Sequence, residues 1–277
     1  MIKRASRLIA LAVSLLLVAA LFPAQATHPV YSDLPDFEGA EIIVAIENQY
    51  APFQFVDPRS EGPIGFDHDL IEELAYRLNF TPVYEITSWE VQMAAVGEGQ
   101  YDMGVNGISI REERREVVEF SDPYVQIEVF LLARDGDDSF TDLESFAADE
   151  SNLLGVMSGG ANYWLAMGYI SDGLMTEDRV VVYNGFAEGV QALVNGDIDA
   201  IPADASVAGG FVNAMGAPVA LVGDVLSTDN FGIIFPKEGS EELIEAVNAA
   251  LATMSDDGYL DFLAYKWLVQ FSPAEAD

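Results

Sequence analysis

Residues 196–203 read Gly196-Asp197-Ile198-Asp199-Ala200-Ile201-Pro202-Ala203, and residues 99–106 follow the same plan with Gly99-Gln100-Tyr101-Asp102-Met103-Gly104-Val105-Asn106. Each stretch follows an amphipathic run and begins with a glycine, which is typical of a helix C-terminus. A β-branched or aromatic residue, an aspartate and a short apolar strand come next. Ligands bind at the carboxyl ends of strands in open α/β sheets. Two such units therefore predict two α/β lobes that face each other across a cleft.

Each repeated strand delivers polar residues at its carboxyl end. The first gives Asn106-Gly107-Ile108-Ser109, and the second gives Asp204. An acid in the position of Asp204 is either a helix cap or a ligand contact, and the spacing alone leaves both interpretations open.

Hydrophobic periodicity predicts further strands and helices on both sides of each repeated unit. The expected strands are 41–46, 82–86, 124–133, 153–156, 180–183 and 231–236. The expected helices are 67–78, 89–96, 186–194, 240–254 and 259–267, with another that begins after residue 161. Residues 47–65 are expected to form a polar loop. The chain is expected to build lobe 1 from residues 41–132 and 228–277 and lobe 2 from residues 133–227, joined by a hinge of two strands.

The N-terminus predicts export. Lys3, Arg4 and Arg7 precede an apolar run, and Ala24-Gln25-Ala26 supplies the small residues of a cleavage site. The run is shorter than the roughly 20 residues of a membrane span, so we expect a signal peptide over 1–26 rather than a retained anchor. Residues 27–40 are expected to be a loose leader, and the mature protein to be periplasmic.

Composition excludes several function classes. The chain has no cysteine, which rules out disulfides, thiolate catalysis and a lipidated N-terminal cysteine. It carries 46 acidic and 12 basic residues, a formal net charge of −34. Such a surface repels nucleic acid, and its self-repulsion is screened by salt. We interpret the charge as adaptation to a saline environment.

Residues able to carry catalysis are scarce. The only histidines are His28 and His68. His68 lies between Asp67 and Asp69, where a metal site is conceivable, but acids in a first helical turn are ordinary partners of the helix dipole. We expect no metal and no cofactor.

Other polar and aromatic residues have two interpretations each. Arg114 lies in the charged run 111–116, whose spacing indicates a solvated helix. Gly159-Gly160 forms either a plain turn or a carboxylate site at a helix N-terminus. Four aromatic residues belong either to the core or to a pocket: Tyr50, Phe53, Phe66 and Trp89.

Taken together, short segments over nearly the whole mature chain resemble the bacterial extracellular solute-binding proteins of family 3, the amino-acid-binding receptors of ABC importers. The matching segments are Tyr50-Ala51-Pro52-Phe53, Gly65-Phe66-Asp67 through Leu70, Tyr101-Asp102, Ile108-Ser109 to Arg114, Phe120-Ser121-Asp122-Pro123-Tyr124, Ile198-Asp199-Ala200 to Asp204 and Phe231-Gly232-Ile233. The resemblance implies the two-lobed periplasmic-binding-protein fold (type II). It also implies a zwitterionic ligand, either an amino acid or a compatible solute, and delivery to an ABC permease. We expect a monomer.

The resemblance also implies a ligand site. Arg114 would grip the ligand α-carboxylate, since a guanidinium offers two parallel hydrogen bonds, and Asp204 would take the α-ammonium. The remaining implied contacts are Asn106, Gly107 and Ser109 from lobe 1, the backbone at Gly160 and Ala161 from lobe 2, Tyr50 and Trp89 around the side chain, and Glu47 at its distal end. Ser158-Gly159-Gly160-Ala161 departs from the Gln-Gly-Thr/Ser-Thr frequent in the family and loses a hydroxyl contact.

The rival interpretation is an enzyme on the same fold. Periplasmic cyclohexadienyl dehydratases resemble these receptors and use an added general acid in the cleft, where this chain has Val207. A valine cannot donate a proton, so we expect a binding protein and no enzyme. A sensor input domain is a third alternative.

Overall fold

The computed structural model describes residues 31–57, 62–206 and 217–271. The chain divides into two units, Met1–Ser32 and Asp33–Asp277, and every described strand and helix belongs to the second unit. The predicted signal peptide, His28 and Val207 lie outside the described residues. Residues 37–40 belong to the expected loose leader, yet the Phe37 amide donates to the Leu78 carbonyl at 2.9 Å.

The first five-stranded sheet joins strands that are far apart in the sequence. Its strand order is β5-β1-β6-β13-β7. The bounds are β1 Glu41–Ile46, β5 Thr81–Ile86, β6 Met103–Gly104, β7 Glu119–Phe120 and β13 Ile234–Phe235. β1 pairs in parallel with β5 along its whole length, and β13 runs antiparallel to β6 and β7. The carboxyl ends of β1, β5 and β6 therefore lie at one edge of this sheet, which is where a ligand site is expected.

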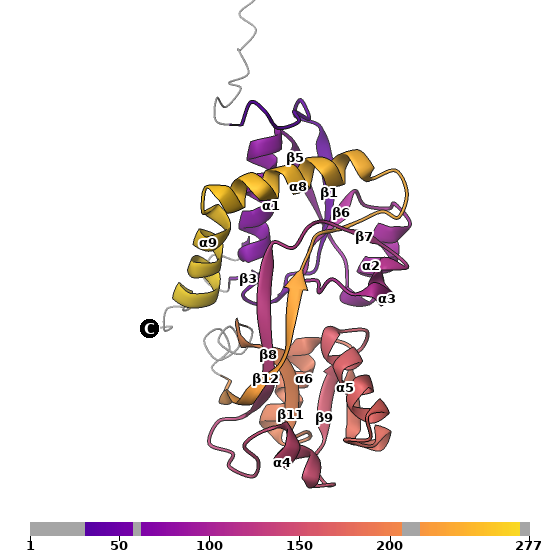
Figure 1. Cartoon of the computed structure of the whole chain (residues 1–277), viewed down its shortest axis with the longest axis vertical. Coiled ribbons are helices and arrows are strands. Elements are labelled where there is room, and N and C mark those ends of the chain that lie inside the picture. The colour runs from indigo at the N-terminus through magenta and orange to yellow at the C-terminus, as the bar shows by residue number, and fades with distance from the viewer. Residues whose placement is uncertain (1–30, 58–61, 207–216, 272–277) are drawn as a thin grey trace, which may run out of the picture. The chain divides into compact units, whose positions relative to one another are not determined.

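Several helices accompany the first sheet (Figure 1). Their bounds are α1 Phe66–Leu78, α2 Trp89–Gly97, α3 Glu112–Arg115, α8 Glu241–Asp256 and α9 Tyr259–Ala264. The predicted apolar face of α1 is buried, and α8 and α9 pack against α1. The single helix predicted over 259–267 is instead α9 followed by a π-helical segment, Tyr265–Gln270.

The second five-stranded sheet has the order β10-β9-β11-β8-β12. The bounds are β8 Val125–Arg134, β9 Leu154–Met157, β10 Val180–Tyr183, β11 Ala200–Asp204 and β12 Val219–Phe231. Its helices are α4 Leu143–Ala148, α5 Ala161–Ser171 and α6 Phe186–Asn195, with a short 3-10 turn at Glu177–Arg179. β11 is buried throughout and ends at Asp204, which places this carboxylate at the carboxyl edge of the sheet.

The repeated unit builds the same contact in each five-stranded sheet. In the first, the Ile43 amide donates to Asp102 Oδ2 at 2.7 Å, and the Asp102 amide donates back to the Ile43 carbonyl at 3.0 Å. In the second, the Leu153 amide donates to Asp199 Oδ2 and the Asp199 amide donates to the Leu153 carbonyl, both at 2.9 Å. The repeated aspartate thus joins the start of its own strand to the neighbouring strand, which explains why the pattern occurs twice.

Two further segments differ from expectation. Residues 47–65 contain a three-stranded sheet, β2 (Gln49–Tyr50), β3 (Gln54–Val56) and β4 (Pro63–Ile64), in place of the predicted loop. The strand predicted over 231–236 is interrupted: β12 ends at Phe231, and Ile234–Phe235 forms the separate strand β13.

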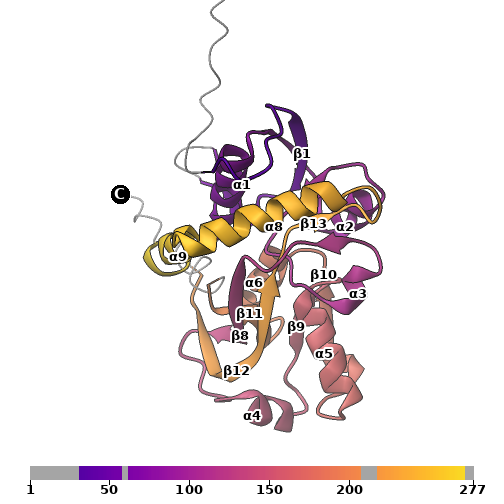
Figure 2. The ribbon, with the colours of Figure 1, turned by 45° about the horizontal axis from the view of Figure 1, so that its top comes forward.

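β8 and β12 run side by side where the chain passes between the two five-stranded sheets (Figures 1 and 2). They pair antiparallel, with a shift of register between Val222 and Ser227. The sequence of β12 shows little hydrophobic alternation, so its own pattern does not predict a strand. Its long pairing with β8 holds it in the extended conformation.

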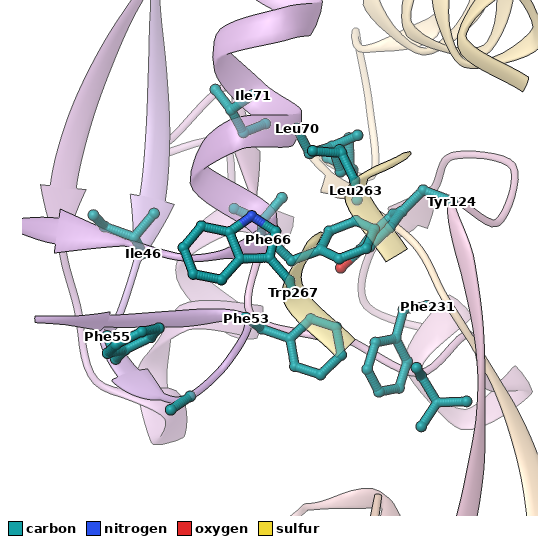
Figure 3. Packing of buried hydrophobic residues seen from close by; sticks show 14 of the residues in the cluster. Ile46, Phe53, Phe55, Phe66, Leu70, Ile71, Tyr124, Phe231, Leu263 and Trp267 are labelled. Carbon is teal, nitrogen blue, oxygen red and sulfur yellow. The ribbon is translucent and has the colours of Figure 1, made fainter. Parts of the chain in front are cut away.

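Aromatic side chains pack among aliphatic ones in the main hydrophobic core (Figure 3). Phe53, Phe66 and Phe231 are almost wholly buried, and Phe53 lies 5.9 Å from Phe66 and 5.1 Å from Phe231, centroid to centroid. Phe53 and Phe66 are therefore core residues, one of the two interpretations that their sequence context allows. Within the described residues, we find no helix with the length and apolar character needed to span a bilayer.

Candidate functional site

Residues attached to both five-stranded sheets line one pocket, with an empty volume of about 750 Å³ that includes open solvent. All of the predicted site residues line it except Gly160: Glu47, Tyr50, Trp89, Asn106, Gly107, Ser109, Arg114, Ala161 and Asp204. Gly160 precedes the first residue of α5, and its amide donates to the Met157 carbonyl at 2.9 Å. The structure therefore brings together residues from β2, α2, α3, α5 and β11.

Arg114 is the buried cation of the pocket. Its residue is only 5% exposed, so the solvated interpretation of the charged run is wrong at this position. Nη1 donates to the Ser109 carbonyl at 2.9 Å and Nη2 to the Gly159 carbonyl at 3.1 Å. The guanidinium also lies over the Trp89 ring, 5.2 Å from its centroid. Burial, and next the charge of Arg111, lower the pKa of Arg114 to about 10, which leaves it cationic at neutral pH.

The Nε–H of this arginine remains available. Nε is buried and has no hydrogen-bond partner among the described residues. A buried donor without a partner is costly unless a ligand or water accepts from it. The cation can therefore serve a ligand anion as well as the two backbone carbonyls it already binds.

Asp204 is the buried anion of the pocket. It is 7% exposed, and its Oδ2 accepts a hydrogen bond from the Tyr50 hydroxyl. Burial raises the pKa of the Asp204 carboxyl to about 7, the Tyr50 hydrogen bond opposes that rise, and the negative charge of Asp229 adds to it. An isolated buried carboxylate is expensive, so a cationic ligand group is the natural partner for this side chain.

Glu47 and Asn106 form a polar corner of the pocket with Trp89. Glu47 Oε2 accepts from Asn106 Nδ2 at 2.9 Å, and Oε1 accepts from the Trp89 amide at 3.3 Å. Asn106 Oδ1 is buried without a partner among the described residues. The Trp89 indole N–H donates to the Ser158 carbonyl at 3.0 Å. Tyr50 and Trp89 thus line the pocket, the second of the two interpretations that the sequence allows for the aromatic residues.

Ser109 and Gly107 are held by neighbouring acids. Ser109 Oγ donates to Asp229 Oδ2 at 2.8 Å, and the Gly107 amide donates to Asp67 Oδ2 at 2.9 Å. Gly107 has a φ of +53°, and an added Cβ would come within 3.0 Å of the Tyr50 ring and 3.1 Å of the Phe231 ring. Glycine is therefore required here both by the backbone and by the packing.

Asp67 is a buried support beneath the pocket. Besides the Gly107 amide, it accepts from the Tyr124 hydroxyl at 2.8 Å and from Gln54 at 3.3 Å. Burial raises the pKa of Asp67 to about 7 in spite of these donors. Its neighbour His68 is bonded through Nε2 to Asn48 Oδ1 at 2.7 Å. In the described part of the chain, no group of three acids or histidines is placed to hold a metal ion.

Several pocket residues were not anticipated from the sequence. They are Gln49, Val129, Met157, Asn162, Leu165, Gly185, Phe186, Ala187, Pro202, Ala203, Ser227 and Phe231. Phe186 and Ala187 are the first two residues of α6 and directly follow Gly185. A glycine before a helix is a signal that these residues lie near the end of a strand. No local signal marks Val129 and Ser227. They are brought together by the pairing of β8 with β12, a contact between distant parts of the chain that places them opposite each other.

Comparison with known proteins supports one family. The family model for bacterial extracellular solute-binding proteins, family 3, matches residues 42–270. The chain is 29% identical over 236 residues to the L-cystine-binding protein TcyJ of Escherichia coli (strain K12), covering 83% of each chain.

Solved structures with the same fold include two amino-acid-binding proteins. An ancestral arginine-binding protein bound to arginine has a TM-score of 0.73 and 29% identity, covering 83% of this chain and 99% of that one. The ancestral amino acid-binding protein AncCDT-1, a precursor of cyclohexadienyl dehydratase, has a TM-score of 0.71 and 27% identity, covering 83% and 95%. These proteins are described as binding proteins and not as enzymes. With its type II two-lobed α/β architecture, this chain belongs to the bacterial extracellular solute-binding proteins of family 3.

Proposed function

We propose that this protein is a periplasmic receptor that binds a zwitterionic amino acid, or a related compatible solute, and delivers it to an ABC permease. The observation that carries the proposal is the pairing of one buried cation, Arg114, with one buried anion, Asp204, on a single pocket. A zwitterion that leaves water needs a partner of opposite sign for each of its charges. The names of the cystine- and arginine-binding relatives support the same class of ligand.

The remaining parts of the proposal follow the family. We propose a signal peptide over 1–26, lobe 1 over 41–132 and 228–277, and lobe 2 over 133–227. Closure of the lobes would be a population shift, because a ligand that touches both lobes binds the closed arrangement more tightly. We propose a monomer.

Calorimetry tests the proposal. Purified mature protein in molar NaCl is titrated with each of the twenty L-amino acids, ectoine and glycine betaine. We expect at least one of these zwitterions to bind. Arg114→Ala should weaken the binding of that ligand by about 2–5 kcal/mol, because the buried carboxylate of the ligand loses its charged partner.

Arg115→Ala is the matched control. Arg115 is the next residue of α3, its side chain is 39% exposed, and it lies outside the pocket. Unchanged affinity is expected for this variant. Wild-type affinity in Arg114→Ala, or no binding across the whole screen, would contradict the proposal.

The dehydratase alternative has one neighbour in its favour, the described precursor of cyclohexadienyl dehydratase. That protein is itself described as amino acid-binding. Arg114 and Asp204 suit the recognition of a zwitterion without any reaction, so we retain the receptor as the proposed function.

A further inference from the structure

Tyr50 connects the two sides of the pocket. It ends β2 of the three-stranded sheet, which follows β1 in the chain, whereas Asp204 ends β11 in the second five-stranded sheet, 154 residues away in the sequence. The hydroxyl of Tyr50 donates to Oδ2 of Asp204. An aromatic ring expected to flank the ligand side chain is therefore bonded to the residue expected to hold the ligand ammonium.

The direction of the Tyr50 ring is set by its packing. It stacks on Phe53 with 5.7 Å between centroids and an interplanar angle of 19°. Its edge meets Phe186 of α6, at 5.8 Å and 80°. Because the Tyr50 ring packs between Phe53 and Phe186, few other rotamers are open to it. Its hydroxyl is therefore already oriented toward the Asp204 carboxylate.

Only one oxygen of Asp204 is used by Tyr50. Oδ2 accepts the hydroxyl, whereas Oδ1 accepts no hydrogen bond from the described residues. A carboxylate can accept at both oxygens. Because Asp204 lines the pocket, its second oxygen remains for a ligand donor.

We propose that Tyr50 is a positioning residue for Asp204: its hydroxyl fixes one carboxylate oxygen, turns the other to the ligand ammonium, and stabilises the ionised form that this contact requires. The inference rests on the proposed function, since it concerns the same ligand. It assigns the hydroxyl a task separate from that of the aromatic ring.

The electrostatics of the pocket agree with this geometry. Burial raises the pKa of Asp204 to about 7, and the Tyr50 hydrogen bond lowers it. The other charged groups that act on this pair are Asp229 on β12, which raises the pKa values of both Asp204 and Tyr50, and Arg114 on α3, which lowers that of Tyr50. Asp204 also acts on Tyr124, the partner of Asp67. Loss of the Tyr50 hydroxyl should therefore raise the pKa of Asp204 further.

The test uses Tyr50→Phe, which removes the hydroxyl and keeps the ring. The probe is the tightest-binding L-amino acid of the calorimetric screen, titrated between pH 5.5 and pH 8.5 in buffers of different ionisation enthalpy. In the wild type, affinity should fall below about pH 7, and binding there should release a proton as Asp204 ionises. In Tyr50→Phe, affinity at pH 7 should drop about tenfold, and both effects should move to higher pH.

Two further variants keep the outcome decisive. Tyr84→Phe removes a hydroxyl that donates to Glu72 at 2.9 Å, away from the pocket, and should bind as the wild type does. In an Asp204→Asn background, Tyr50→Phe should have little added effect, because the two residues act as one pair. An unchanged pH midpoint, or a uniform loss of affinity at every pH, would overturn the positioning role. Absence of binding by any amino acid would instead overturn the proposed function itself.

Discussion

Glu47 illustrates how a single residue can set the preference of a pocket. Arg114 and Asp204 are assigned to the two charges of the ligand backbone, which leaves Glu47 as an additional acid on the pocket wall. Among the described residues, its two oxygens accept only from the Trp89 amide and the Asn106 side chain, which are neutral donors. The pocket thus keeps a negative charge that a cationic side chain would complement.

We predict that Glu47→Gln weakens binding of L-arginine and L-lysine by about tenfold while sparing L-glutamine, because only the cations lose a Coulomb partner. The aromatic faces of Tyr50 and Trp89 favour the same cationic ligands. Calorimetry in molar salt measures the change, and Glu90→Gln on exposed α2 surface is the control. If aspartate or glutamate proves to be the tightest ligand, the cationic preference is wrong while the receptor function remains.

The sequence led to pocket-lining residues where a residue stands at the end of a repeated strand or in a family motif. Asp204 and Arg114 are examples. Asp229 was missed, because nothing around it marks an acid that would bond Ser109 across 120 residues. Gly160 was expected to face the ligand, yet its amide is already bonded to Met157. The local pattern identifies the loop, whereas the direction of each amide depends on the folded turn.

At the scale of elements, periodicity predicted the central strands and the amphipathic helices because each buries one continuous face. Short strands such as β2 and β4 have two residues each, too few for a period to show. β12 has 13 residues with a mixed burial pattern and a shift of register after Val222. Its existence follows from pairing with β8, a long-range contact that no local window contains.

Arg179 stabilises the C-terminal end of α4 through hydrogen bonds. It is 4% exposed. Its guanidinium donates to four backbone carbonyls: Asn152 at 2.9 Å, Ala147 at 2.9 Å, Asp149 at 2.9 Å and Phe146 at 3.2 Å. These include the carbonyls at the C-terminal end of α4, which have no partner inside the helix.

We predict that Arg179→Met lowers the free energy of unfolding by about 3 kcal/mol, because several buried carbonyls lose their donor at once. Urea unfolding in molar NaCl measures the change, with Arg115→Met as an exposed-arginine control. Ligand affinity of the folded protein should stay close to that of the wild type, since Arg179 lies outside the pocket. A midpoint equal to that of the wild type would show that water can replace the guanidinium.

At the scale of the whole molecule, charge is the dominant feature. The sequence has a formal net charge of −34. Lys237 pairs with Glu119, and Lys266 pairs with Asp69 at 2.5 Å. Each of these lysines thus pairs with one acid, and the 46 acidic residues far outnumber the 12 basic residues that could neutralise them.

We predict that the thermal unfolding temperature rises when the NaCl concentration is increased from about 0.05 M to 1 M. The Debye length shrinks to about 3 Å over this series, so repulsion among the acidic residues is screened. Differential scanning calorimetry over that series measures the rise. A matched series in sucrose separates charge screening from general solute effects. Flat midpoints in NaCl would mean that the acids are spaced widely enough to avoid repulsion, and the saline interpretation would fail.

The bond from the Trp89 indole to the Ser158 carbonyl also has a spectroscopic consequence. Indole fluorescence responds to the partner of its N–H and to nearby charge, and Trp89 has both a carbonyl and the Arg114 guanidinium beside it. The sequence has three tryptophans; Trp164 is 38% exposed, and Trp267 is bonded to Asp69 away from the pocket. Emission from Trp89 should therefore follow the separation of the two sides of the pocket. Trp89 fluorescence would thus report the proposed closure of the lobes without an attached dye.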